Sequence, residues 1–166
     1  MSTSENLQAA FAGESQANRK YLAFAKKAEQ DGFPQVAKLF RAAAEAETVH
    51  AHAHLRAMDG ISGTGGNLQA AMDGEAHEFQ SMYPGFLAEA REEGNKRAER
   101  SFENALAVEE VHHGLYSEAL AAVQAGNDLD AAPIHVCPVC GHTVVGEAPG
   151  TCEICGARGE QFMEIA

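Results

Sequence analysis

Apolar residues recur with a helical period over the first three quarters of the chain, with polar residues on the opposite faces. Three short stretches rich in glycine or proline interrupt this pattern: "DGFP" at 31–34, "GISGTGG" at 60–66 and "GN" at 94–95. We therefore predict four helices, at about residues 4–30, 35–59 and 67–93, and from the "GN" pair to about residue 124.

The breaks between the helices predict the architecture. The glycine-rich stretch at 60–66 is expected to be a flexible crossover between two helix pairs, with Asn67 as the N-cap of the third helix. Pro84 falls inside that helix and predicts a kink. After Ala131 the helical period stops and glycine, cysteine and valine dominate. The fold class is therefore mainly α, with a four-helix bundle at 1–131 and a small domain at 132–166.

A duplicated motif lies on the second and fourth predicted helices. "FRAAAEAETVH" at 40–50 and "FENALAVEEVH" at 102–112 share Phe, Ala, Glu and His at the same spacing, so that Glu47 and His50 recur 62 residues later. The first and third helices repeat too, because "GESQANRKY" at 13–21 matches "GEAHEFQSMY" at 74–83. The chain is thus a duplicated helix pair.

The repeated residues predict a two-metal site. One E-x-x-H pair on a helix is commonplace and often consists only of two solvated surface residues. Two such pairs in register with two duplicated glutamates are much rarer and indicate a shared site. Buried carboxylates without a counter-charge cost several kcal/mol each, and two divalent cations would neutralise them. This arrangement is typical of ferritin-like di-iron carboxylate bundles, and the ligand set suits iron or manganese. The six candidate ligands are Glu14, Glu47, His50, Glu75, Glu109 and His112.

A seventh candidate ligand breaks the symmetry of the repeat. Glu78 lies one turn after Glu75, whereas the equivalent position in the first helix is Ala17. Glu78 is expected to compete with His50 for one metal. Tyr21 and Tyr83 are candidates to hydrogen-bond the ligand carboxylates, although packed tyrosines explain their positions nearly as well.

The tail carries a second metal motif. "CPVCG" at 137–141 and "CEICG" at 152–156 place Cys137, Cys140, Cys152 and Cys155 in two C-x-x-C-G knuckles. Four thiolates bind zinc or iron tetrahedrally, and the knuckles alone do not distinguish the two metals. About 35 residues contain too little core to fold unaided, so the metal should organise this module.

Composition excludes several functions. The net charge of −12, from 24 acidic and 12 basic residues, argues against nucleic acid and anionic membranes as partners. No apolar run approaches the ~20 residues of a membrane span, and the N-terminus resembles no secretory signal. A cytoplasmic location is expected, and it agrees with cysteines that serve as metal ligands rather than disulfides.

Taken in order, the motifs "FRAAAEAETVH", "GEAHEFQSMYP", "VEEVH" and the final "GEQFMEI" resemble the rubrerythrin family over nearly the full chain. The resemblance implies a di-iron four-helix bundle whose ligands include Glu78, a rubredoxin-like iron–tetrathiolate domain, and association into dimers. The tail departs from the family in lacking the usual proline of the second knuckle, in a spacer one residue short, and in His142 at a position commonly aromatic.

The resemblance further implies a non-haem peroxidase that reduces hydrogen peroxide to water. Electrons would come through the four-cysteine iron from an external donor such as a rubredoxin or an NAD(P)H-dependent reductase. Two other hypotheses remain at this point: a ferroxidase or iron-storage protein built on the same bundle, and a non-enzymatic zinc-ribbon interaction module.

Overall fold

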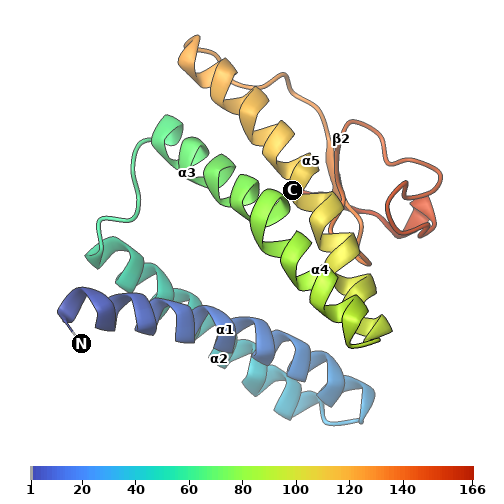
Figure 1. The fold of residues 1–166 in the computed structure, drawn as a ribbon. Helices are drawn as coiled ribbons and strands as arrows, with labels where there is room; N and C mark the ends of the chain where they lie inside the picture. Colours follow the sequence, from blue (N-terminus) through green and yellow to red (C-terminus); the bar gives the residue numbers. More distant parts are fainter. Residues whose placement is uncertain (1) are drawn as a thin grey trace. The chain divides into compact units, whose positions relative to one another are not determined.

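The computed structural model describes residues 2–166 and divides into two compact units, the first ending at Ser62 and the second spanning Gly63–Ala166. The first unit is an antiparallel pair of helices, α1 (Thr3–Gln30) and α2 (Pro34–Ala57), coloured blue to teal in Figure 1. The second contains α3 (Thr64–His77), α4 (Tyr83–Glu92), α5 (Lys96–Gln124) and the C-terminal module. None of the helices among residues 2–166 combines the length and hydrophobicity that crossing a membrane requires.

The ends of the first helix pair follow from local sequence. Ser2 caps α1 in a capping box, in which its hydroxyl accepts a hydrogen bond from the Glu5 backbone N–H at 3.2 Å. At the other end Gly32 adopts φ +83°, a left-handed conformation that glycine tolerates. The backbone N–H of Phe33 then reaches back to the Ala28 carbonyl at 2.8 Å, and Pro34 begins α2.

Small residues let α1 and α2 approach closely. Ala25, Ala28 and Ala37 are buried together, with Phe40 packed against them. Asn18 is also buried between the two helices, and its amide donates hydrogen bonds to the Ala44 carbonyl and the Thr48 hydroxyl at 2.7 and 2.8 Å. The predicted helices at 4–30 and 35–59 are thus present with boundaries shifted by one or two residues.

The third predicted helix differs from the sequence expectation. It begins at Thr64 rather than Asn67, with Gly63 as its N-cap, so Asn67 is not the cap residue and part of the glycine-rich stretch is helical. A Cβ atom at Gly65 would lie 3.9 Å from Val123 Cγ1, which shows how closely this first turn approaches α5. Packing against α5 therefore outweighs the low helix propensity of the two glycines.

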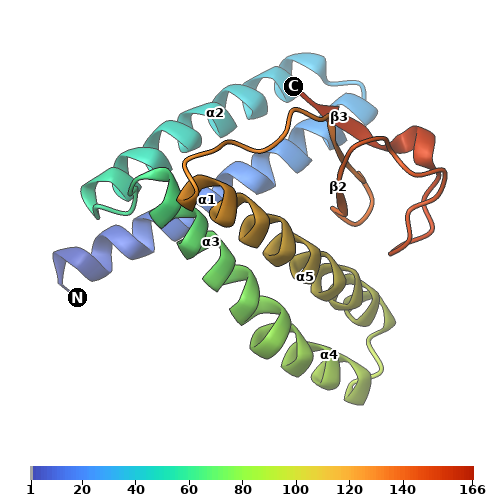
Figure 2. The same ribbon diagram turned by 90° about the horizontal axis from the view of Figure 1, so that it is seen from above.

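Where the sequence predicted a kink at Pro84, the structure has a π-helix just before the proline. The five residues of η1 (Glu78–Met82) separate α3 from α4, and the Tyr83 backbone N–H bonds to the Glu78 carbonyl five residues back. Pro84 follows in the first turn of α4, where its missing N–H costs little. Figure 2 shows α3, η1 and α4 continuing in line beside α5.

The chain after residue 131 forms a small module with little regular structure. Three antiparallel strands of three residues each pair in the order β2-β1-β3. These strands are β1 (Ile134–Val136), β2 (Thr143–Val145) and β3 (Met163–Ile165), with the 3-10 helix η2 (Gly159–Gln161) before the last. So little regular structure leaves the cysteine loops as the centre of the module.

Candidate metal centres

The first unit brings three of the predicted ligands together. Glu14 comes from α1, and Glu47 and His50 come from successive turns of α2; one ligand atom from each lies within 4.8 Å of the others. His50 Nδ1 is 3.0 Å from Glu47 Oε2. The i,i+3 spacing on α2 is what turns the carboxylate and imidazole towards one point.

The second unit repeats this cluster with the second half of the motif. Glu75 on α3 meets Glu109 and His112 on α5, again with ligand atoms within 4.8 Å. His112 Nδ1 is 2.9 Å from Glu109 Oε2 and 3.7 Å from Glu75 Oε1. Each unit therefore holds one Glu/Glu-x-x-His triad, with the oxygen and nitrogen donors that iron accepts.

The carboxylates of each triad perturb one another. Burial, followed by the hydrogen bond and negative charge of Glu109, raises the pKa of Glu75 to about 7. In the first unit a hydrogen bond to Glu47 raises the pKa of Glu14, and the same bond, helped by His50, lowers the pKa of Glu47. Two carboxylates this close repel each other when both are ionised, so one of them holds a proton. A metal cation can replace that proton and neutralise both charges.

Acid should therefore weaken metal binding by the second triad. A raised carboxyl pKa means that Glu75 holds a proton below about pH 7, and that proton competes with the metal. We expect the ferrous-ion affinity of the full chain to fall as the pH is lowered from 8 to 6. In the metal-free protein at pH 6.5, infrared spectra should show a protonated carboxyl band that metal removes and Glu75→Gln lacks. Glu110→Gln, an exposed neighbour on α5, is the control; an unchanged spectrum in Glu75→Gln would contradict the assignment.

Aromatic residues on the helices of both units are duplicated as well. Tyr21, Phe24 and Phe40 pack as one trio with ring centroids 5.6–6.3 Å apart. The second trio packs at 5.6–6.2 Å and lies 62 positions further along, at Tyr83, Phe86 and Phe102. Both tyrosines are therefore packed, and burial followed by the charge of Glu78 raises the pKa of Tyr83, which places its phenol in the field of the carboxylates.

The π-helix accounts for the asymmetry around Glu78. The trios are related by 62 residues, but Glu14 and Glu75 are related by 61, so the second repeat has one extra residue between Glu75 and Tyr83. A π-helix absorbs one such residue without breaking the helix. Glu78 lies at its first position, half-buried. The one extra residue in the second repeat was therefore the feature of the sequence that could have predicted the π-helix.

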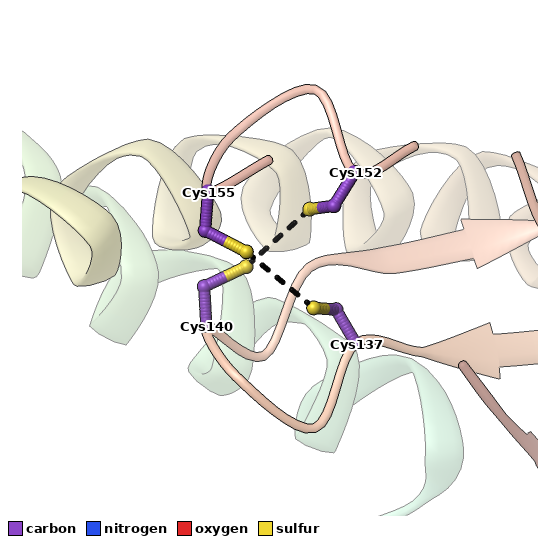
Figure 3. Close-up of side chains that lie close together, drawn as sticks. All are labelled: Cys137, Cys140, Cys152 and Cys155. Carbon is purple, nitrogen blue, oxygen red and sulfur yellow. Dashed lines mark hydrogen bonds between the residues drawn. The ribbon is translucent and has the colours of Figure 1, made fainter. Parts of the chain in front are cut away.

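The four cysteines converge as predicted (Figure 3). Cys137 Sγ lies 3.7 Å from Cys155 Sγ, and Cys140 Sγ lies 3.6 Å from Cys152 Sγ. A tetrahedral site with metal–sulfur bonds of about 2.3 Å has edges of about 3.8 Å, so the sulfurs already have the spacing of a tetrathiolate. Burial raises the pKa of the Cys137 thiol, but hydrogen bonds from the backbone N–H groups of Cys140 and Val139, together with those from the Cys155 and Cys140 thiols, outweigh burial and lower the pKa to about 7.

Both knuckles use the same backbone turn. Gly141 N–H bonds to the Cys137 carbonyl and Gly156 N–H bonds to the Cys152 carbonyl, each at 2.9 Å, and both glycines have positive φ. The unusual His142 is buried at the aromatic position, with its ring centroid 6.4 Å from that of Phe162 and its Nε2 3.1 Å from Glu153 Oε1.

One contact of the site was not predicted from the sequence. His112 Nε2, the ring nitrogen that faces away from Glu109, lies 3.0 Å from Thr143 Oγ1 in the C-terminal module. The two residues are 31 positions apart and belong to different motifs, so no local pattern pointed to the pair.

Comparison with known proteins identifies the lineage. The family model described as Rubrerythrin matches residues 5–120. The chain belongs to the rubrerythrin family. It is 34% identical to Rubrerythrin-2 of Clostridium acetobutylicum, covering 97% of this chain and 95% of that protein. It is 39% identical to Nigerythrin of Nitratidesulfovibrio vulgaris, covering 97% and 85%.

Solved structures agree with this assignment. Nigerythrin in its partially reduced state aligns with a TM-score of 0.59 and 36% identity, covering 99% of this chain and 87% of that one. Its fully reduced, all-ferrous state gives the same TM-score with 35% identity. The predicted fold class, ferritin-like helices with a rubredoxin-like four-cysteine domain, is confirmed. Membership places the chain in a family of di-iron oxidoreductases of oxidative stress defence, and its donor sets fit iron.

Proposed function

We propose that the chain is a non-haem peroxidase that reduces hydrogen peroxide to water. The observation that carries the proposal is the presence, on one chain, of two Glu/Glu-x-x-His triads and one tetrathiolate cluster. Two ferrous ions in the triads would supply the two electrons of the reaction H2O2 + 2e− + 2H+ → 2H2O. The four-cysteine iron would then return electrons one at a time from a rubredoxin or an NAD(P)H-dependent reductase.

The duplicated motif suggests a division of labour among the ligands. In this proposal Glu14 and His50 hold one iron, Glu75 and His112 hold the other, and Glu47 and Glu109 bridge both. Residues 1–131 form the di-iron bundle and residues 132–166 the electron-transfer domain. Hydrogen peroxide is small and uncharged, so the net charge of −12 does not repel it.

Rapid mixing after anaerobic reduction tests the activity. We expect the reduced, iron-loaded chain to be reoxidised by peroxide at both chromophores, and much faster than by air. Reoxidation by oxygen that is faster than reoxidation by peroxide would overturn the proposal. Metal analysis of the same sample distinguishes iron from zinc in the four-cysteine site, because only the oxidised iron site is red.

The ferroxidase alternative uses the same triads but differs in assembly. Iron storage requires a large cage and has no need of a tetrathiolate, so the four cysteines favour the peroxidase. We propose a homodimer or a small homo-oligomer, and Leu39 and Val49 on α2, 68% and 59% exposed, are apolar surface suited to contact between subunits. Light scattering coupled to size exclusion separates such an assembly from a cage.

Glu78 is predicted to tune the oxidised state of the site. Ferric iron prefers a hard anionic oxygen to a neutral imidazole, so we expect Glu78 to replace His50 as a ligand on oxidation. Glu78→Ala should retain two irons through the six repeated ligands, while peroxidase turnover falls roughly 10- to 100-fold. Stopped-flow turnover together with the iron content measures both effects.

The control for this variant is Glu89→Ala, an exposed carboxylate on α4. Structures of the oxidised and reduced protein show the ligands directly. Turnover unchanged in Glu78→Ala, or His50 bound in both states, would show that Glu78 is only a solvated carboxylate.

A further inference from the structure

The C-terminal module follows one face of α5 towards the metal triad. Cys140 lines a shared surface hollow with Asn104 and Ala105 of α5. One step along, a Cβ atom at Gly141 would lie 3.8 Å from Val108 Cγ1. Thr143 then meets His112, one helical turn after Val108. The module thus brings its first knuckle alongside the helix that carries two of the predicted ligands.

The hydrogen bonds of Thr143 fix the direction of its contact with His112. A threonine hydroxyl has one hydrogen, and here it is directed to the Gly141 carbonyl, 3.1 Å away. The oxygen is then left to accept a hydrogen bond from His112 Nε2 at 3.0 Å. With the hydroxyl hydrogen directed to the Gly141 carbonyl, the matching tautomer of His112 carries its proton on Nε2, and Nδ1 is the ring nitrogen that faces Glu109 and Glu75.

We propose that Thr143 is a positioning residue for the metal site: it holds the His112 ring in one orientation and one tautomer, with Nδ1 available as the ligand. A hydrogen-bond acceptor on the second nitrogen of a metal-binding histidine raises its basicity and prevents rotation of the ring. The inference rests on the metal site of the proposed function but not on the peroxidase reaction.

The two histidines of the repeat are consequently held to different degrees. The side chain of His112 is 27% exposed and bonded at both ring nitrogens. His50, its repeat mate, has a side chain 56% exposed, and within residues 2–166 its ring is hydrogen-bonded to Glu47 alone. Thr143 comes from the module and has no counterpart in the duplicated helices. The module thus fixes the ring of His112, whereas His50 has no such contact and can be replaced more easily as a metal ligand.

The four-cysteine cluster is what holds Thr143 in place. The Cys137 backbone N–H bonds to the His142 carbonyl at 2.9 Å, and the Gly141 N–H bonds to the Cys137 carbonyl. Thr143 begins β2 directly after this knuckle, with Val136 of β1 as its strand partner. A loaded tetrathiolate therefore fixes the hydroxyl that orients a ligand of the other metal site.

Nuclear magnetic resonance on the unmutated full chain tests the tautomer directly. With Zn²⁺ as the probe in every site, long-range nitrogen–proton spectra should show the His112 proton on Nε2, exchanging slowly with water, and Nδ1 bound to metal. A proton on Nδ1, or metal on Nε2, would overturn the proposal whatever any variant does.

Substitutions test the energetic consequence. Thr143→Val keeps the shape of the side chain but removes the acceptor, and Thr143→Ser restores it. We expect anaerobic ferrous-ion titrations of the full chain, with its four-cysteine site loaded, to show binding weakened roughly 10- to 100-fold at one of two sites in Thr143→Val. Thr143→Ser should bind as the wild type does, and the Nε2 proton of the zinc-loaded Thr143→Val protein should exchange rapidly.

Thr151→Val is the matched control, because Thr151 is an exposed threonine of the same module that lies directly before the second knuckle, away from Thr143 in the sequence. It should change neither titration nor exchange. Unaltered metal binding in Thr143→Val, or a loss that Thr143→Ser fails to restore, would contradict a positioning role. Neither readout depends on turnover, so a protein without peroxidase activity would still decide this question.

Discussion

Cys140→Ser is expected to unfold the C-terminal module while leaving the helices intact. Its strands have three residues each, and only Cys137, His142 and Cys152 are buried among residues 132–166. Structural metal binding at a four-ligand site contributes roughly 10–16 kcal/mol, far more than so small a core can supply. The variant should lose the red chromophore and expose residues 132–166 to protease, with helical circular dichroism nearly unchanged.

Thr151→Ser is the control, since it makes an equally small change at an exposed position of the module. Removing the metal from the wild type with a chelator should reproduce the Cys140→Ser result. A module that resists protease without metal would show that its sheet folds independently. Because Thr143 belongs to this module, the same variant should also release His112 and weaken one site of the metal titration.

The two ligand clusters were predictable because duplication supplied their pattern twice. Glu47 with His50 and Glu109 with His112 recur at one spacing, and the structure brings each pair to a glutamate of the neighbouring helix. The aromatic trios were less visible, because Phe24, Phe40 and their repeats look like ordinary core residues. Only their ring contacts show that each tyrosine is packed against two phenylalanines in the same way. The roles of Tyr21 and Tyr83 as hydrogen-bond partners remain predictions.

Features that depend on packing were not predictable. Local propensity favoured Asn67 over Thr64 as the start of α3, but contact with α5 makes the glycines helical. Proline chemistry predicted a kink at Pro84, whereas the extra residue of the second repeat is absorbed as a π-helix. The contact between His112 and Thr143 joins the helical Glu-x-x-His motif to the cysteine motif. Neither motif contains a residue whose position indicates contact with the other, so the sequence did not predict it.

Glu109→Gln is expected to abolish binding of the metal pair. Glutamine preserves the size of the side chain but removes the charge that the proposal assigns to both metals. The Glu109 carboxylate also hydrogen-bonds both Glu75 and His112, so neither of the other two triad residues can take over its position. We expect ferrous-ion affinity and peroxidase turnover to fall by on the order of 100-fold or more, beyond the loss typical of outer-shell partners.

The same substitution separates the two metal centres. The tetrathiolate does not use Glu109, so Glu109→Gln should remain red when oxidised and retain one iron per chain. Glu110→Gln, the adjacent exposed carboxylate, should keep full iron content and turnover. Glu47→Gln should match Glu109→Gln, because the repeat gives both the same role. If Glu109→Gln lost only one of the two further irons and kept the other at wild-type affinity, the triads would be independent clusters, and the bridging assignment that underlies the proposed chemistry would be wrong.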